Sequence, residues 1–301
     1  MIKNKLFYVT CRFNIILHMK SDALVNIIKI YFLIVIVIGL IGCESNEPEV
    51  EPSKGIGVFS VSDNKRVTFA PGNLYYCRAN GAWCFQKPQY YCNRIYNLAS
   101  PVFDRYNNGW CSSIDSLGSQ IDLFGWGTGN NPTKTSKDHT QYEDFYEWGN
   151  NKIGTDPKGV WYTMMAEEWE YLIYKRPNAD SLYAFARIYN NVDGLIIMPD
   201  AWTCPDSVKV VLNPDHEDVY FRNVNNYYDN WTILEESGCV FLPLAGRRSG
   251  LLVDDNIDVG AYWVGSYMDE HNAIIFNPKN HKLELSNRSN GYAVRLVREI
   301  K

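Results

Sequence analysis

Residues that commonly carry chemistry occur along the chain, but not in the spacings that known catalytic sites use. The histidines beyond residue 42 form no HExxH or related metal-binding pair. No serine lies in a GxSxG nucleophile elbow. Asp138-His139 is interpreted as a polar loop pair rather than as part of a catalytic triad. We therefore assign no catalytic residue, and we expect neither enzymatic activity nor a cofactor.

Two further patterns resemble binding motifs only in part. Gly125-Trp126-Gly127-Thr128-Gly129 has spaced glycines, but it has neither the strand and helix that should flank a dinucleotide-binding loop nor the full fingerprint, so tight turns explain it better. Asp254, Asn256 and Asp258 have the first three spacings of a calcium loop. Val259 then stands in the glycine position, and Gly265 where a bidentate glutamate is needed. We predict an acidic exposed loop, with calcium binding as the alternative and no other metal site.

Acidic and aromatic side chains are the remaining candidates. Glu167, Glu168 and Glu170 open a predicted helix, where solvated carboxylates would complement the helix dipole. The chain has 21 tyrosines and 9 tryptophans, and such side chains supply binding area at little entropic cost. Six of them fall in predicted loops: Tyr90, Tyr91, Tyr106, Trp110, Tyr227 and Tyr228. Most aromatic residues are predicted to belong to the core or to pin loops, so the ligand-binding residues stay unassigned.

The cysteines suggest a disulfide at one hairpin. Asn80-Gly81 is a turn signal between two strand-like runs. Counting outward from a two-residue turn places Cys77 opposite Cys84, within disulfide reach. The other candidate pairs, Cys92 with Cys111 and Cys204 with Cys239, have no such register argument. No pair has CxxC spacing, so neither zinc nor thioredoxin chemistry is indicated.

The N-terminal segment has the order of parts expected of a lipoprotein signal. Ile30 to Gly42 is a run of thirteen uncharged, mostly apolar residues, shorter than the roughly 20 needed to cross a bilayer as a helix. Leu40-Ile41-Gly42-Cys43 resembles the lipobox of bacterial lipoproteins, in which the signal is cut before the cysteine and the cysteine is acylated. This resemblance implies a signal peptide over residues 1–42, lipid attachment at Cys43 and a membrane anchor. Because 42 residues is long for a signal, we hypothesise that the true start is Met19.

An acidic stretch follows the lipid cysteine. Residues 43–55 are rich in glutamate and proline, which keep a tether extended and solvated. The stretch also resembles the surface-export signal of Bacteroidetes lipoproteins. That resemblance implies an outer-membrane protein facing the cell exterior, whereas a plain spacer would leave it facing the periplasm.

Composition and patterning then describe the rest of the chain. The 301 residues are 46% hydrophobic and carry a formal charge of −5, which excludes a disordered chain and provides no basic face for nucleic acid. Residues 56–301 contain no linker, and we predict a single domain there. Helices are expected over Ala166–Lys175 and Asn230–Ser237, the second ending at Gly238. Strands are expected within Val58–Phe69, and at Gly194–Pro199, Cys239–Pro243, Ala273–Phe276, Leu283–Leu285 and Tyr292–Val297. Short strands with two helices and long loops indicate an α+β domain.

Several blocks together carry a wider resemblance. They are Phe59-Ser60-Val61-Ser62, Val67-Thr68-Phe69-Ala70-Pro71-Gly72-Asn73-Leu74, Ile121-Asp122-Leu123-Phe124-Gly125-Trp126-Gly127-Thr128-Gly129, Leu195-Ile196-Ile197-Met198-Pro199-Asp200, Val240-Phe241-Leu242-Pro243-Leu244-Ala245-Gly246 and Gly291-Tyr292-Ala293-Val294-Arg295-Leu296-Val297-Arg298. These resemble Bacteroidetes surface proteins similar to the Fibrobacter succinogenes major paralogous domain. They are more remotely similar to the formylglycine-generating-enzyme branch of C-type-lectin-like folds. The resemblance implies an irregular, loop-rich C-type-lectin-like domain with short mixed or antiparallel strands. Formylglycine-generating activity is not expected, because that family uses a cysteine pair near the C-terminus and the last cysteine here is Cys239.

Three hypotheses for function follow. The first is a non-enzymatic cell-surface lipoprotein that binds glycan or protein through its loops. The second is a structural or accessory component of a surface assembly such as an adhesin or fimbria. The third is a hydrolase with an unrecognised site.

Overall fold

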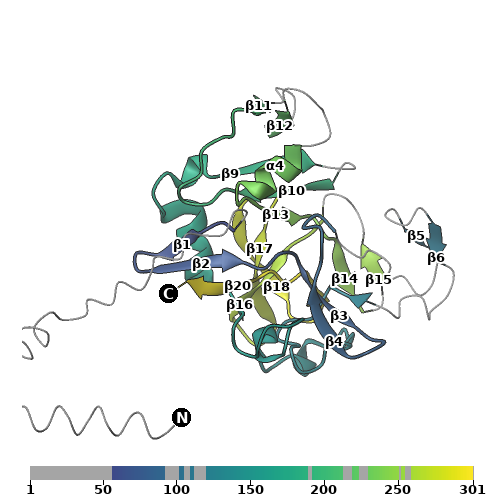
Figure 1. The fold of residues 1–301 in the computed structure, drawn as a ribbon. Helices are drawn as coiled ribbons and strands as arrows, with labels where there is room; N and C mark the ends of the chain where they lie inside the picture. Colours follow the sequence, from purple (N-terminus) through teal and green to yellow (C-terminus); the bar gives the residue numbers. More distant parts are fainter. Residues whose placement is uncertain are drawn as a thin grey trace, which may run out of the picture. The chain divides into compact units, whose positions relative to one another are not determined.

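The computed structural model describes residues 56–91, 102–104, 109–111, 120–188, 192–212, 219–223, 230–250, 252–254 and 259–300. All of them belong to one compact unit, Pro52–Lys301 (Figure 1). The predicted signal, Cys43 and the tether lie outside the described residues, as do Cys92, Tyr106, Tyr227, Tyr228, Asn256 and Asp258. Predictions that depend on these positions stay predictions.

The two ends of the unit share one sheet. Strands β1 (Phe59–Ser62) and β2 (Lys65–Phe69) form a hairpin, and β2 then pairs with β20 (Leu296–Ile300) and β20 with β8 (Tyr162–Thr163). The β2–β20 register places Phe69 opposite Val297. The predicted strand residues within 58–69 are confirmed as this hairpin.

A second antiparallel sheet has the order β13-β10-β9. All six residues of β10 (Val192–Ile197) are buried between β9 (Tyr183–Ile188) and β13 (Val240–Pro243). Helix α4 (Asn230–Glu236) precedes β13 and buries Trp231 and Leu234. The chain leaves α4 through Gly238, whose φ of 88° lies in the left-handed region that suits glycine. The predicted helix, its end and both predicted strands are confirmed here.

A third sheet separates two parts of the hydrophobic core. Its strands are β16 (Tyr262–Tyr267), β17 (Asn272–Asn277) and β18 (Lys282–Asn287), in that order. Ala273 and Ile275 point into one buried cluster and Phe276 into another, because successive side chains of a strand alternate between its faces. Trp169 of α3 (Ala166–Glu170) stacks on Phe276 with ring centroids 4.2 Å apart. The predicted helix over 166–175 is present, with its second half, Tyr171–Lys175, wound as a π-helix.

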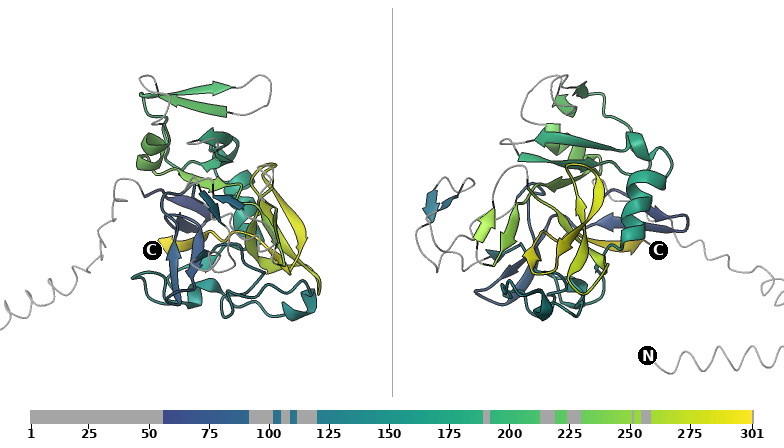
Figure 2. Two further views of the ribbon diagram at one scale, coloured as in Figure 1. Left: turned by 90° about the vertical axis from the view of Figure 1, so that its right-hand side faces the viewer. Right: turned by 180° about the vertical axis from the view of Figure 1, so that it is seen from behind.

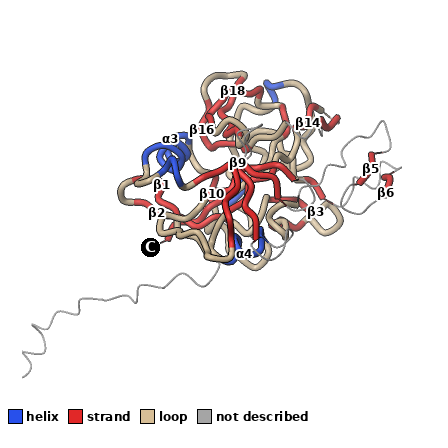
Figure 3. The backbone as a smooth tube through the Cα atoms, turned by 90° about the horizontal axis from the view of Figure 1, so that it is seen from above, coloured by secondary structure: helices blue, strands red, loops and turns tan. Residues whose placement is uncertain are grey.

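The remaining described strands form small sheets. These are β3 (Leu74–Cys77) with β4 (Ala82–Phe85) and β7 (Gln120–Ile121); β14 (Arg247–Ser249) with β15 (Leu252–Asp254) and β19 (Asn290–Gly291); β5 (Val102–Asp104) with β6 (Gly109–Cys111); and β11 (Val208–Leu212) with β12 (Val219–Asn223). Figure 2 shows the β11–β12 hairpin at one end of the unit, beyond α4. Short strands, few helical turns and much loop are evident in Figure 3. The α+β class is confirmed.

Buried arginine side chains donate hydrogen bonds to backbone carbonyls in several loops. Loop carbonyls that have no strand or helix partner still need a donor when they are buried. Arg248 donates through Nε to the Leu123 carbonyl at 2.9 Å and through Nη1 to that of Gly250 at 2.8 Å. Arg176, Arg288 and Arg295 bind backbone carbonyls in the same way. These guanidinium groups replace part of the hydrogen bonding that longer strands would supply.

The strand register predicted for the hairpin that carries Cys77 and Cys84 is wrong. In the β3–β4 hairpin Cys77 lies opposite Ala82, and Cys84 lies opposite Tyr75. The loop has four residues rather than two, because Gly81 takes the left-handed φ of 69° as its last residue and its N–H donates to the Cys77 carbonyl at 2.9 Å. Both cysteines are free thiols. The geometric argument for a disulfide between them therefore fails.

Two other local predictions need correction. Glu168 is buried rather than solvated, and it accepts from Lys65 Nζ at 2.6 Å, Tyr162 Oη at 3.0 Å and its own helix's Met165 N at 2.9 Å. The predicted strand Tyr292–Val297 begins only at Leu296. Residues 292–295 run between two core clusters and make isolated bridges to Phe124 and Tyr262 instead of a continuous ladder.

Candidate functional site

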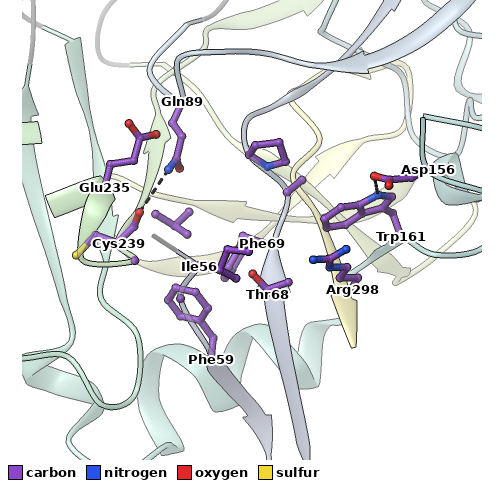
Figure 4. Close-up of a pocket in the computed structure, with 15 residues that line it drawn as sticks. Ile56, Phe59, Thr68, Phe69, Gln89, Asp156, Trp161, Glu235, Cys239 and Arg298 are labelled. Atoms are coloured by element: carbon purple, nitrogen blue, oxygen red, sulfur yellow. Dashed lines mark hydrogen bonds between the residues drawn. The ribbon is translucent and has the colours of Figure 1, made fainter. Parts of the chain in front are cut away.

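A pocket of about 340 Å³ opens where the first two strands, α4 and β20 meet (Figure 4). Its apolar surface comes from residues near the start of the unit, including Ile56, Phe59 and Phe69. Polar side chains stand on either side of this apolar strip, with Asp156, Trp161 and Arg298 on one side and Glu235, Gln89 and Cys239 on the other. The volume lies at the small end of the range of about 300–1,000 Å³ typical of ligand sites.

The first wall is built around Trp161, which directly precedes β8. Its Nε1 donates to Asp156 Oδ2 at 2.9 Å, and the Arg298 guanidinium lies 5.2 Å from the indole centroid. The Phe85 ring meets the indole edge-on at 5.1 Å. With its faces contacted in this way Trp161 is only 5% exposed. The indole therefore orients Asp156 and Arg298 and offers the pocket an edge rather than an open face.

Close backbone packing sets the position of Trp161. A Cβ at Gly149 would lie 1.6 Å from the Trp161 carbonyl oxygen, so only glycine allows this approach. The Glu147 carboxylate accepts from Thr163 Oγ1 at 2.7 Å and from the Thr163 N–H at 3.1 Å. The segment 147–149 thus holds β8, and with it the first wall of the pocket.

The second wall is organised by Gln89. Its Oε1 accepts from the Phe241 N–H at 3.0 Å, and its Nε2 donates to the Cys239 carbonyl at 3.4 Å. Behind it, Arg295 Nη2 donates to the Phe241 carbonyl at 2.6 Å. Burial lowers the pKa of Arg295 to about 10, while the nearby charges of Tyr262 and Glu235 favour the cation. Gln89 and Arg295 consequently hold the loop after β4 against β13.

The arrangement can hydrogen-bond a polar ligand from two sides. Asp156 and Glu235 contribute carboxylates, Arg298 a guanidinium and Thr68 a hydroxyl, around an apolar strip. A sugar ring carries hydroxyl groups around its edge and C–H groups on its faces, so it needs both kinds of surface. The same two carboxylates are also the residue types that glycoside hydrolysis uses.

None of these wall residues was predicted from the sequence to bind a ligand or to act in catalysis. Asp156 and Trp161 come from one segment, Glu235 from α4 and Arg298 from β20, and these three segments share no motif. Of the predicted aromatic loop residues, Tyr90 packs partly buried against a core cluster, close in sequence to Gln89. Trp110 belongs to β6 and is not among the described residues that line the pocket.

The other predicted polar sites lie elsewhere. Asp138 caps a short 3-10 turn by accepting from the Thr140 N–H at 3.0 Å, as the loop interpretation predicted. His139 stacks on His271 with centroids 4.1 Å apart. Trp126 of the glycine-rich segment is buried and donates to the Val264 carbonyl at 3.1 Å, which agrees with a structural role. Asp254 ends β15 opposite Arg247, and Asn256 and Asp258 lie outside the described residues.

Among the described residues no group of three or more His, Cys, Asp or Glu side chains is placed to hold a metal ion. The described helices include none with both the length and the apolar character needed to cross a bilayer. Comparison with protein-family models, with curated proteins and with solved structures finds no match for the chain.

Proposed function

We propose that the chain is a lipid-anchored surface protein whose folded unit binds a glycan in the pocket between Trp161 and Glu235. The observation that carries the proposal is the lining of that pocket, where carboxylate, amide, hydroxyl and guanidinium groups surround an apolar strip. Such a combination satisfies both the hydroxyl groups and the C–H faces of a sugar. A protein ligand is the alternative to a glycan in this binding role.

The proposal also includes the type of fold and the cellular location of the protein. Small sheets, two short described helices and long pinned loops are compatible with a C-type-lectin-like domain of the kind found in Bacteroidetes surface lipoproteins. The lipobox-like sequence ending at Cys43 supports lipid attachment, and the acidic stretch after it supports display on the outer membrane. No metal or cofactor is part of the proposed binding.

A glycan array and a mucin-binding assay on the purified full-chain protein test the proposal, each with and without calcium. We expect saturable binding that free sugar competes away. Asp156→Asn and Glu235→Gln each remove a charged acceptor from one wall and should weaken binding at least tenfold. Asp138→Asn, in an exposed loop outside the pocket, is the matched control and should leave affinity unchanged. Absence of binding to every glycan and mucin would refute the proposal.

Hydrolysis is a second candidate, because Asp156 and Glu235 place two carboxylates on the same pocket. The same two variants separate it from simple binding. A hydrolase would release product from a labelled polysaccharide, and either substitution would abolish turnover while leaving substrate capture largely intact. A binding module would show no turnover in any of the proteins.

A surface assembly is the third candidate, and a different observation favours it. Tyr267 is 63% exposed and Met268 is 65% exposed at the end of β16, and apolar side chains of this size are common in protein contacts. Co-purification of fixed partners that is lost in Tyr267→Ser, with the pocket variants unaffected, would favour this role.

A further inference from the structure

Two cysteines from different elements approach each other behind the second wall of the pocket. Cys239 precedes β13 and lines the pocket, and Cys204 lies in the loop before β11. A side-chain contact joins the segments that carry them, because Trp202 Nε1 donates to Ser237 Oγ at 3.0 Å. Cys204 comes two residues after Trp202, and Cys239 comes two residues after Ser237. The chain is therefore held together directly beside both thiols.

Each of the two sulfur atoms makes a further contact beside this hydrogen bond. Cys204 Sγ lies 3.6 Å from the Val208 carbonyl oxygen, and Val208 and Cys239 belong to the same buried cluster. Cys239 Sγ lies 3.5 Å from Ser237 Oγ. Burial raises the pKa of Cys239 to about 12, and the charge of the Cys204 thiolate adds to that rise. The thiols are thus near enough to influence each other, while both remain reduced in this structure.

We propose that Cys204 and Cys239 form a disulfide that links the loop before β11 to the pocket wall. The two thiols differ in access, since Cys204 is exposed and Cys239 is 1% exposed. Cys204 is therefore the entry point for a small disulfide oxidant such as oxidised glutathione.

The reaction proceeds by two exchanges. The Cys204 thiolate attacks the glutathione disulfide, a bond forms between Cys204 Sγ and one glutathione sulfur, and the second glutathione leaves as a thiolate. The Cys239 thiolate then attacks Cys204 Sγ and displaces the first glutathione. The protein loses two electrons and two protons, and the oxidant becomes two molecules of reduced glutathione.

The link would steady the second wall without occupying the pocket. Gln89 Nε2 donates to the Cys239 backbone carbonyl, so tying the Cys239 side chain restrains the group that orients Gln89. A cross-link between segments this far apart in sequence also restricts the unfolded chain. We expect the thermal midpoint to rise by about 5 °C on oxidation.

Peptide mapping of the full-chain protein tests the proposal independently of any ligand. The protein is equilibrated with mixtures of reduced and oxidised glutathione, quenched with acid, alkylated, digested without reduction and analysed by mass spectrometry. We expect a linked pair of peptides carrying Cys204 and Cys239, and a rise in thermal midpoint that Cys204→Ser abolishes. Cys77→Ser, which alters another free thiol, should change neither result.

Two outcomes would overturn it. One is that both cysteines stay alkylatable or carry only glutathione at every ratio. The other is that Cys204 links to a different cysteine. Because Cys204→Ser changes an exposed side chain, a failure to fold is not the expected cause of a lost link, and circular dichroism of that variant verifies this.

Discussion

Glu168 shows how much a single side chain differs from its neighbours on the same short helix. Its carboxylate accepts from Lys65, Tyr162 and the Met165 N–H, and it is only 9% exposed, whereas Glu167 faces solvent. Burial and the Glu168 carboxylate together raise the pKa of Tyr162. The residue is a structural acceptor that ties β2, β8 and α3 together.

Replacing Glu168 by Ala should lower the free energy of unfolding by about 2–3 kcal/mol, because it leaves buried donors without an acceptor. Glu167→Ala is the matched control, one position away on the exposed side, and should change stability by less than about 0.5 kcal/mol. Urea denaturation of the three proteins measures the difference. Equal losses in both variants would contradict the role assigned to Glu168.

The buried thiol of Cys239 predicts a pH dependence under reducing conditions. Its pKa is raised to about 12 in the folded protein, from 9.0 for a solvated thiol. Between these values the unfolded chain releases the proton while the folded protein keeps it. The stability that the Cys239 thiol contributes is therefore fully present below pH 9. As the pH rises above 9, this contribution falls by up to about 1.4 kcal/mol per pH unit.

Urea denaturation between pH 8 and 11 measures this contribution as the difference between the wild-type protein and Cys239→Ala. Tyrosine ionisation affects both proteins alike, so the difference isolates the thiol. The wild-type curve should be the steeper one above pH 9. Parallel curves would show that the thiol is not buried as described.

At the scale of the elements, buried arginines donate the hydrogen bonds that buried backbone carbonyls would receive from a neighbouring strand in a longer sheet. Arg295 donates to the carbonyls of Ala70 at 3.1 Å and Phe241 at 2.6 Å, and to Asn73 Oδ1 at 3.0 Å. It thereby joins the segment before β20 to the loops after β2 and to β13. Without the guanidinium, these acceptors would be left buried and unpaired.

Arg295→Met keeps much of the side-chain volume but removes every donor, and should lower the free energy of unfolding by about 4 kcal/mol. It should also reduce ligand binding in the pocket, because Phe241 and Gln89 lose a common anchor. Arg66→Met on the exposed face of β2 serves as the control for removing an arginine. Thermal unfolding of both variants gives the comparison, and an unaltered midpoint for Arg295→Met would disprove the anchoring role.

The elements that sequence predicts well are those whose side chains show a local period. Trp169 and Leu172 of the first helix, Leu234 and Gly238 at the second, and the apolar run of β10 each carry such a signal. The β3–β4 register was mispredicted because Asn80-Gly81 fits both a two-residue turn and the end of a four-residue loop, and only tertiary contacts choose between them. The pocket escaped prediction for the same reason, since Asp156 and Glu235 meet only after folding.

At the scale of the whole molecule, the proposed function connects an anchor sequence to a folded unit. Ile56 and Gly57, the first described residues of that unit, line the pocket. A ligand bound there would therefore contact the point at which the predicted tether joins the domain. Anchoring and binding are separable, because the pocket walls come from residues far along the chain.

A substitution at Cys43 tests the proposed lipid anchor. Cys43→Ser removes the acceptor for the lipid, so the protein should move from the membrane fraction to the soluble fraction and lose incorporation of labelled fatty acid. Cys77→Ser, which changes a cysteine of the folded unit, should keep both properties. Retention of Cys43→Ser in the membrane with its fatty-acid label would refute lipidation at this residue. Glycan binding by the soluble variant should equal that of the wild-type protein, since the pocket requires the folded unit and not the lipid.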